Sequence, residues 1–356
     1  MKKITLLIIS IILISGCYDY VELNELSIIS MITIDKINDE YNLTFEILND
    51  RTKGEKDNTN KSIIISAKGS TIASAIADGS SKIPKKAYFA HLKVLAISKS
   101  IAKTDLKSIV EYFLRSPNIR NEFYLVLIDN IKIDDIYTTQ SEENPVVSEY
   151  ITSMLKDNQK SYNNVTNNNF ENIIIDIFTK GKDAVIPVIK IENNKLKASG
   201  SGLLNNYTLK EILSSKESNL LNILKNNPLN TLFTYKCPNI DKKITLSIYS
   251  GKTKIDSKNI TIDIMSEIEE YDCQEDLKDV NTFKKFNNYY EKQFQKDIFG
   301  LYHKMQIART DSLGIGKSIY NNNNKYQVDD WFKINPRIKV NLKINKEGLI
   351  YEVDNG

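Results

Sequence analysis

A long apolar stripe near the C-terminus places the strongest constraint on the fold. Its side chains recur at intervals of three or four residues, which is the spacing of one face of an α-helix. The members of the stripe are Phe283, Phe286, Tyr290, Phe294, Ile298, Leu301 and Met305. Such a helix needs a continuous apolar partner surface. We expect an antiparallel meander of strands at 229–235, 244–249 and 260–268 to supply it, together with strands at 338–344 and 349–353.

Apolar patterns in the N-terminal half predict further strands and helices. Segments 27–35 and 41–48 flank a turn containing Asn38 and Asp39, which is typical of a β-hairpin. The other expected strands lie at 62–67, 91–97, 123–128 and 184–191, and the expected helices at 70–83, 106–114, 209–224 and twice between 143 and 178. Thr104 is the expected N-cap of the helix at 106–114. Because strands and helices are segregated along the chain, the patterns favour an α+β fold with mainly antiparallel sheets over a doubly wound fold.

Chain length and punctuation predict three parts. The chain has 356 residues, and a domain usually holds about 100 to 200. Gly200 and Gly202 lie near an expected boundary. The expected parts are a leader at 1–16, an N-terminal α+β domain at 17–135, a middle region at 136–205 and a C-terminal α+β domain at 206–356.

Composition excludes several classes of function. The 48 Lys and Arg nearly balance the 45 Asp and Glu, and the net charge of +3 gives no strong field for a nucleic acid backbone. His91 and His303 are the two histidines, so most histidine-based metal sites and catalytic triads would need both to meet in space. We therefore expect no catalytic residue, cofactor or metal. We expect His91, at the start of an apolar strand, to be buried and structural, and His303 to be solvated.

The first seventeen residues predict a lipid anchor. Lys2 and Lys3 precede the apolar run 4–14, whose eleven residues would span about half of a bilayer core of roughly 30 Å, so the run fits a secretory signal better than a membrane-spanning helix. The run ends in Ile-Ser-Gly-Cys at 14–17, which resembles the bacterial lipobox. That resemblance implies cleavage before Cys17 and attachment of diacylglycerol to its sulfur. An ordinary cleaved signal and an uncleaved anchor are the alternatives. Two acyl chains give lasting membrane attachment, so we expect a body tethered to the outer face of a membrane with no further crossing.

Two cysteines remain for other chemistry. Cys237 and Cys273 flank the expected meander, and an extracytoplasmic location would allow them to form a disulfide. The alternative is a pair of small buried thiols. Without a Cys-x-x-Cys motif, we do not expect them to hold a metal.

Arg115 and Arg120 are conspicuous because arginine is scarce in this chain. Both flank an expected turn, where a guanidinium could bind a carboxylate. Two interpretations stay open: an intramolecular salt bridge that holds a helix to a strand, or a contact with a partner protein.

Other chemical motifs are weak. The segment DSLGIGKS at 311–318 ends like a phosphate-binding loop, but Asp311 stands where that loop needs glycine and a helix precedes it where a strand is required, so we expect a simple loop. Adjacent acidic pairs are expected to be solvated, because neighbouring side chains on a strand diverge. These pairs are Asp134/Asp135, Glu142/Glu143, Glu269/Glu270 and Asp329/Asp330.

Several segments, in this order, resemble the C-subunit family of spore germinant receptors, the Ger(x)C lipoproteins. The most specific stretch is 69–130, which contains HLKVLAISKSIAK and LRSPNIR at matching spacing. Further similar blocks are residues 17–24, 32–35, GSGLL at 200–204, DIFGLYHK at 297–304 and DDWFK at 329–333. Tyr18 replaces the usual Trp, Leu23 replaces Ile, and Val21 stands where Arg is common.

The resemblance implies a three-domain α+β lipoprotein on the outer face of the spore inner membrane, assembled with two integral membrane subunits of one receptor. It also implies an accessory role in receptor assembly or signalling, without catalysis. The competing hypothesis is a lipid-anchored solute-binding protein of an importer, which should show two α/β lobes with parallel sheets around a cleft. A lipid-anchored hydrolase would need a nucleophile with an aligned base, and we find no such pair in the sequence.

Overall fold

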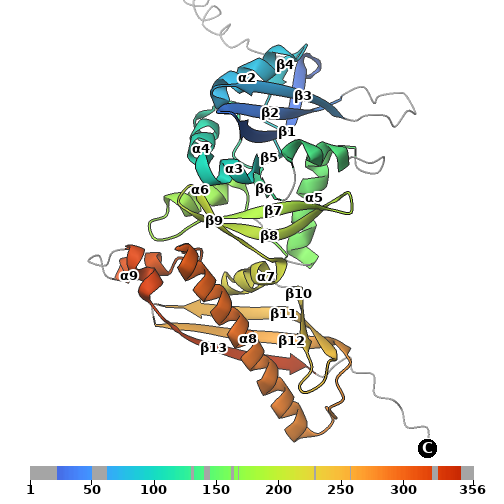
Figure 1. The fold of residues 1–356 in the computed structure, drawn as a ribbon, viewed down its shortest axis with the longest axis vertical. Coiled ribbons are helices and arrows are strands. Elements are labelled where there is room, and N and C mark those ends of the chain that lie inside the picture. Colours follow the sequence, from blue (N-terminus) through green and yellow to red (C-terminus); the bar gives the residue numbers. More distant parts are fainter. Residues whose placement is uncertain are drawn as a thin grey trace, which may run out of the picture.

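The computed structural model describes residues 22–49, 62–129, 132–139, 145–161, 164–166, 168–227, 230–256, 258–322 and 328–345. Cys17, the strand expected at 349–353 and the Glu142/Glu143 pair lie outside the described residues. In the described part the chain forms two sheets at opposite ends of an elongated molecule, with a long helix across the second sheet (Figure 1).

The larger sheet has nine strands in the order β3-β2-β1-β5-β6-β7-β8-β9, with β4 paired to β1. Their bounds are β1 (Leu26–Ile37), β2 (Glu40–Leu48), β3 (Ser62–Gly69), β4 (Lys86–Tyr88), β5 (Val94–Ser98), β6 (Tyr124–Ile128), β7 (Val185–Glu192), β8 (Lys195–Asn205) and β9 (Thr208–Leu213). The expected hairpin is confirmed: β1 and β2 pair antiparallel, and Asn38 and Asp39 between them both have positive φ, the geometry that a two-residue hairpin turn requires.

Both faces of the larger sheet are covered, because alternate residues of its central strands enter different cores. Leu95 and Leu125 face one core, and Val94 and Val126 face the other. The first core packs against α2, α3, α4 and α6, and the second against α5 and the short 3-10 helix η2 (Figure 1). The bounds are α2 (Ile72–Ser81), α3 (Lys99–Thr104), α4 (Leu106–Arg115), η2 (Ile133–Thr139), α5 (Val147–Ser161) and α6 (Phe170–Phe178).

The fold class expected from the sequence is confirmed, since the structure is α+β and most strand pairs are antiparallel. The middle of the larger sheet is nevertheless parallel, because β1, β5, β6 and β7 run in one direction. Parallel neighbours need a crossover between them, and α3 and α4 provide it between β5 and β6.

The smaller sheet has the order β10-β11-β12-β13 and carries the long helix α8. The bounds are α7 (Ser215–Leu224), β10 (Thr231–Lys236), β11 (Lys243–Ile255), β12 (Asn259–Tyr271), α8 (Val280–Ala308), α9 (Ile315–Asn322), η3 (Val328–Lys333) and β13 (Arg337–Asn345). The expected meander is confirmed, because β10 pairs with β11 and β11 with β12, both antiparallel. The expected stripe is confirmed as well, because six of its seven residues are buried and Phe283 is partly buried. Strand β13 joins β12 in parallel register.

Two local predictions are wrong. Thr104 does not cap α4: it ends α3, and its hydroxyl donates to the Ser100 carbonyl, while Asp105 takes the capping position. Gly200 and Gly202 lie inside β8, and the domain boundary expected near them stays a prediction. A Cβ on Gly200 would lie 2.2 Å from the Leu213 carbonyl oxygen, so this glycine permits close approach of the end of β9. Residues 209–213 belong to strand β9, and the helix expected at 209–224 begins only at α7. Ser214 is the N-cap of α7, and the sequence pattern did not reveal it.

The two sheets share one continuous core. Val185 and Leu203 of β7 and β8, together with Leu213 of β9, belong to the same buried cluster as α7, α8 and the smaller sheet. The larger sheet also crosses the boundary expected at 135, because β6 pairs with β7. The three-part division of the chain stays a proposal.

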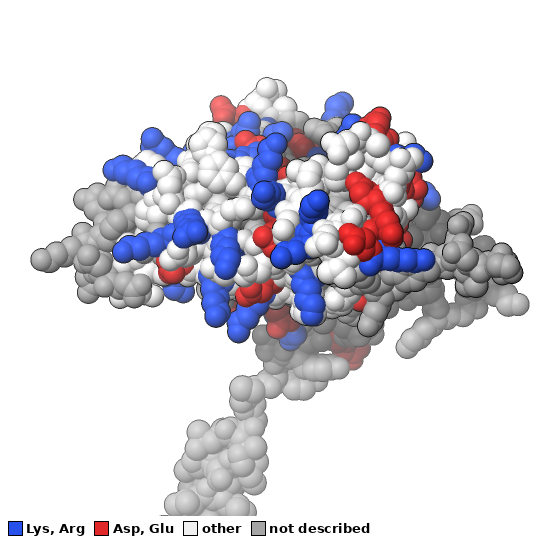
Figure 2. All heavy atoms as spheres, turned by 90° about the horizontal axis from the view of Figure 1, so that it is seen from below, with Lys and Arg blue, Asp and Glu red and all other residues white. Residues whose placement is uncertain are grey.

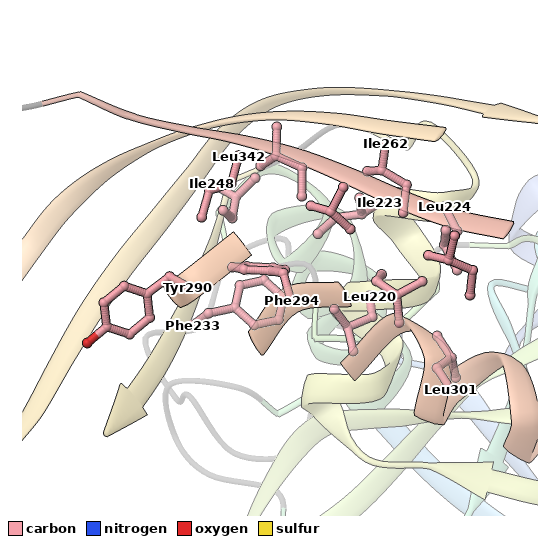
Figure 3. Close-up of a cluster of buried hydrophobic side chains, with 14 of the residues drawn as sticks. Leu220, Ile223, Leu224, Phe233, Ile248, Ile262, Tyr290, Phe294, Leu301 and Leu342 are labelled. Carbon is pink, nitrogen blue, oxygen red and sulfur yellow. The ribbon is translucent and has the colours of Figure 1, made fainter. Parts of the chain in front are cut away.

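We expect Phe294→Ala to lower the free energy of unfolding by about 3 to 5 kcal/mol, because large-to-small changes in a packed core leave a cavity. Phe294 is fully buried, and its ring centroid lies 4.8 Å from that of Phe233 (Figure 3). The control is Phe299→Ala on the outer face of the same helix, where the side chain is 58% exposed; it should change stability by less than about 0.5 kcal/mol. Urea unfolding of both variants measures the difference, and equal losses would contradict this packing.

Candidate interaction site

A junction between two distant loops joins the halves of the molecule. The Asp183 amide donates to the Asp311 carbonyl at 2.9 Å, and the Asp311 amide donates to the Asp183 carboxylate at 2.7 Å. A second pair of contacts flanks this one: the Lys317 amide donates to the Gly181 carbonyl at 2.8 Å, and the Asn205 side-chain amide donates to the Arg309 carbonyl at 2.5 Å. The loop before β7 is therefore fixed against the loop between α8 and α9.

Gly181 makes this contact possible. Its φ is +77°, and a Cβ there would lie 2.4 Å from the Lys317 amide nitrogen. Any other residue would be strained in backbone conformation and would also push the two loops apart.

Asp311 is the buried acid at the centre of the junction. Its carboxylate accepts hydrogen bonds from the amides of Ile315 at 3.0 Å and Gly316 at 2.6 Å, which lie in the first turn of α9. Burial raises the pKa of Asp311 to about 6, and the nearby Asp183 charge adds to that rise while the amide hydrogen bonds oppose it.

A cavity of about 830 Å³ opens beside the junction. Its wall comes from the end of α6 and the loop after it, the β8–β9 turn, β9, the end of α8, and η3. Segments more than a hundred residues apart therefore build one concave surface, and the junction contacts hold it in shape.

Three exposed cations line this cavity: Lys180, Lys210 and Arg309. The Lys180 ammonium lies 4.2 Å from the centre of the Tyr320 ring, and the Arg309 guanidinium lies 5.1 Å from that of Phe332. Within the described ranges, none of the three forms an ion pair. Lys182, also in the wall, is different, because it pairs with the buried Asp176 at 2.6 Å.

Arg309 adopts a left-handed backbone conformation, with φ 53° and ψ 43°. This residue ends α8 at a position where glycine is usual, and a side chain there costs roughly 1 to 2 kcal/mol. Phe178 and Ile307 at the same cavity are 66% and 73% exposed although both are large and apolar. The cavity thus combines unpaired cations with exposed apolar side chains.

The sequence did not single out this site. Its cations come from three separated segments, and lysine is too common here to attract notice. The available signal was Arg309, one of the few arginines, directly after the apolar stripe of α8.

The motifs weighed in the sequence take ordinary structural places. Residues 311–318 follow a helix, as expected, but they begin α9 instead of forming only a loop. His91 is exposed, with its ring 5.5 Å from that of Tyr88, so the prediction of a buried histidine is wrong. His303 is exposed and stacks on Phe299, as expected of a solvated residue. No group of three or more potential metal-binding side chains gathers anywhere in the described ranges.

Arg115 and Arg120 are both exposed. Arg115 pairs with Glu111 at 2.6 Å one turn earlier in α4, so it does not hold the helix to a strand. The spacing of four residues on one helix explains the choice of partner. Arg115 lines a shallow depression of about 420 Å³ at the end of α4. A partner contact at these arginines stays a proposal.

Cys237 and Cys273 are bonded to each other in the structure, with their Cα atoms 5.5 Å apart. Cys237 follows β10 and Cys273 follows β12, so the bond ties the two ends of the meander beneath Tyr290 of α8.

Comparison with known proteins identifies the class of the molecule. A family model for the spore germination protein N-terminal domain matches residues 19–191, and a model described as spore germination B3/GerAC like, C-terminal, matches residues 199–348. Together the two models cover most of the chain, so its class is that of the spore germination proteins. It belongs to the Ger(x)C family, as its sequence blocks suggested.

Relatives match over most of their length. Spore germination protein GerQC of Bacillus cereus is 21% identical over 98% of this chain and 99% of its own length. Spore germination protein KC of Bacillus subtilis (strain 168) is 23% identical over 88% of this chain and 86% of its own. The crystal structure of the GerBC protein has the same fold, with a TM-score of 0.53 and 19% identity over 88% of this chain and 96% of that one.

We expect the stability of the protein to depend on Asp311 between pH 7 and pH 5. The carboxyl binds its proton more tightly in the folded state, with a pKa of about 6, than in the unfolded chain, where the ordinary value is 3.8. Its contribution to stability should therefore rise by about 1 kcal/mol as the pH falls through this window. Asp311→Asn removes the titration but keeps one oxygen for the α9 amides. Urea unfolding at pH 7, 6 and 5 should show a flatter pH dependence for the variant, and parallel curves would contradict the assignment.

We also expect reduction of the Cys237–Cys273 bond to lower the free energy of unfolding by about 3 to 4 kcal/mol, because the bond closes a loop of 36 residues. The measurement is thermal unfolding with and without a reductant. The Cys237→Ser/Cys273→Ser double variant is the control and should unfold at the same lower temperature in both conditions. Labelling of free thiols in the denatured, unreduced wild type at these positions would show that the bond does not form.

Proposed function

We propose that this protein is a non-enzymatic, lipid-anchored subunit of a spore germinant receptor and acts in nutrient-triggered germination through contacts with other proteins. The observation that carries the proposal is the tandem match of both family models, at 19–191 and 199–348. A chain that matches both halves in order is expected to perform the role of the whole family member.

The anchor in this proposal is diacylglycerol on Cys17, and the location is the outer face of the spore inner membrane. No helix in the described ranges is long and apolar enough to cross a membrane. Cys17 and the start of β1 at Leu26 are nine residues apart, a reach of at most about 30 Å. The larger sheet would therefore lie next to the membrane, with the smaller sheet farther away (Figure 1). The partners would be two integral membrane subunits of the same receptor.

The arrangement of polar groups supports contact in place of catalysis. Asp311 is the carboxyl whose pKa is raised to about 6 by burial, and both of its oxygens accept amide hydrogen bonds of α9. That use is structural. The solute-binding alternative is less well supported, because the smaller sheet is covered by α7 and α8 and does not form a second α/β lobe.

We expect Cys17→Ala to release the protein from the membrane fraction of spores and to slow germination, because the variant lacks the lipid-bearing sulfur. Immunoblots of membrane and soluble fractions measure release, and the loss of optical density after nutrient addition measures germination. Unchanged membrane attachment of Cys17→Ala would contradict the anchor.

Purification of the tagged wild type in mild detergent tests the partners. Recovery of two transporter-like or integral membrane germination proteins is the expected result. Recovery of an ATP-driven permease in their place would support the solute-binding alternative and reject the receptor.

A further inference from the structure

The cavity of about 830 Å³ beside the Asp183–Asp311 junction is called the junction cavity below, and the acidic residues in its wall do not balance the charge of its cations. Asp183 and Asp311 are the two acidic residues in its wall, and the carboxylates of both accept backbone amide hydrogen bonds. Neither lies within ion-pair distance of Lys180, Lys210 or Arg309. The three cations therefore present their charge to whatever enters the cavity.

Aromatic rings hold two of these cations in place before anything binds. Tyr320 lies under the Lys180 ammonium, and Phe332 lies under the Arg309 guanidinium. A long basic side chain that is already ordered loses less conformational freedom when it binds an anion. Arg309 also has a left-handed backbone conformation, and strained non-glycine residues of this kind concentrate at functional sites.

The exposed apolar side chains of the cavity wall indicate the size of the occupant. Phe178 and Ile307 are exposed at the cavity, and a small anion would leave them in water. A peptide that carries an aromatic or aliphatic side chain next to its acids would cover both, as the apolar centre and charged rim of protein interfaces do.

We propose that the junction cavity is a docking site for an acidic peptide segment with an adjacent apolar side chain, supplied by a partner protein. The inference rests on the proposed function, in which the partner is a membrane subunit of the receptor. Carboxylates of the segment would pair with Lys180, Lys210 and Arg309, and its apolar side chain would pack against Phe178 and Ile307.

The underside of the molecule is less suitable for such a segment. Figure 2 shows many lysine and arginine side chains there, with acidic side chains interspersed among them. On the outer face of the smaller sheet, Asp263 lies opposite Lys252 in register, and Asn341 donates to its carboxylate. The charges of that sheet face are therefore partly balanced within the face itself.

The test reverses charge at the cavity and, as a matched control, elsewhere. Lys180→Glu/Lys210→Glu changes two exposed cavity residues, and Lys195→Glu/Lys254→Glu changes two lysines that are also exposed but lie outside the cavity. Both variants keep Cys17 and the full chain. Thermal unfolding should show that both variants fold, with a slightly lower midpoint for the cavity variant, because all four side chains are exposed and only Lys180 loses a contact, the one with Tyr320.

Each tagged variant is expressed in spores and purified in mild detergent at about 0.15 M salt. We expect the cavity variant to recover the membrane subunits at least about tenfold less than wild type, and the control variant to stay within about twofold. If wild type recovers the membrane subunits and both variants recover them equally, the docking site is rejected while the proposed function holds. If wild type recovers no membrane subunit, the proposed function fails and the docking site fails with it.

A photo-reactive phenylalanine analogue at Phe178 tests the chemistry of the occupant directly. We expect mass spectrometry to map the cross-link in intact spores to a membrane subunit segment that contains Asp or Glu beside an apolar residue. A cross-link to phospholipid, to a second copy of this chain or to a segment without acids would overturn the proposal, as would a cross-link of equal yield in the Lys180→Glu/Lys210→Glu background.

Discussion

The reciprocal hydrogen bonds between Asp183 and Asp311 set the geometry of the junction between the two halves, and the candidate site depends on that geometry. They join residues 128 positions apart, and each aspartate is also used a second time. Asp183 accepts from the Asn206 amide in the β8–β9 turn, and Asp311 caps α9. One pair of residues therefore positions four segments. A typical hydrogen bond contributes only about 1 kcal/mol net, but loss of the partly buried Asp183 carboxylate would leave the amide of the buried Asp311 without its bond.

The apolar core explains why this small polar contact can stay in register. Val185, Leu203 and Leu213 of the larger sheet pack into the same cluster as α7 and α8, so the halves are already held together by burial of apolar surface. Movement between domains is the usual expectation where the interface is small and polar. Here the interface is apolar and continuous with the second core. The cavity beside the junction is consequently a preformed surface.

Sequence periodicity predicted the elements whose burial pattern is regular. The stripe from Phe283 to Met305 and the hairpin around Asn38 could be recognised because one face of each element is apolar or its turn has characteristic residues. Strands β5 and β6 were predicted from the sequence, but their parallel pairing was not. Strands buried on both faces show no alternation, so local sequence does not reveal whether neighbours are parallel.

The candidate site could not be predicted for a different reason. Its cations come from the loop after α6, from β9 and from the residue that ends α8, and only the tertiary fold brings Lys180, Lys210 and Arg309 to one cavity. His91 shows the same limit at a single position: an apolar neighbourhood in sequence suggested burial, whereas the residue lies before the strand and is exposed.

Residues 311–318 resemble a phosphate-binding loop in sequence, but the start of α9 does not offer free amides to an external anion. A phosphate-binding loop offers free backbone amides at the start of a helix to an anion. In this protein the amides of Ile315 and Gly316 are already bonded to the carboxylate of Asp311, and the Asp311 backbone amide donates to Asp183. An internal anion thus uses the donors that a nucleotide would need. The positive charge left for an external ligand lies beside this helix start, on Lys180, Lys210 and Arg309, where apolar side chains accompany it. The same few residues therefore disfavour nucleotide binding at α9 and favour recognition of a protein surface next to it.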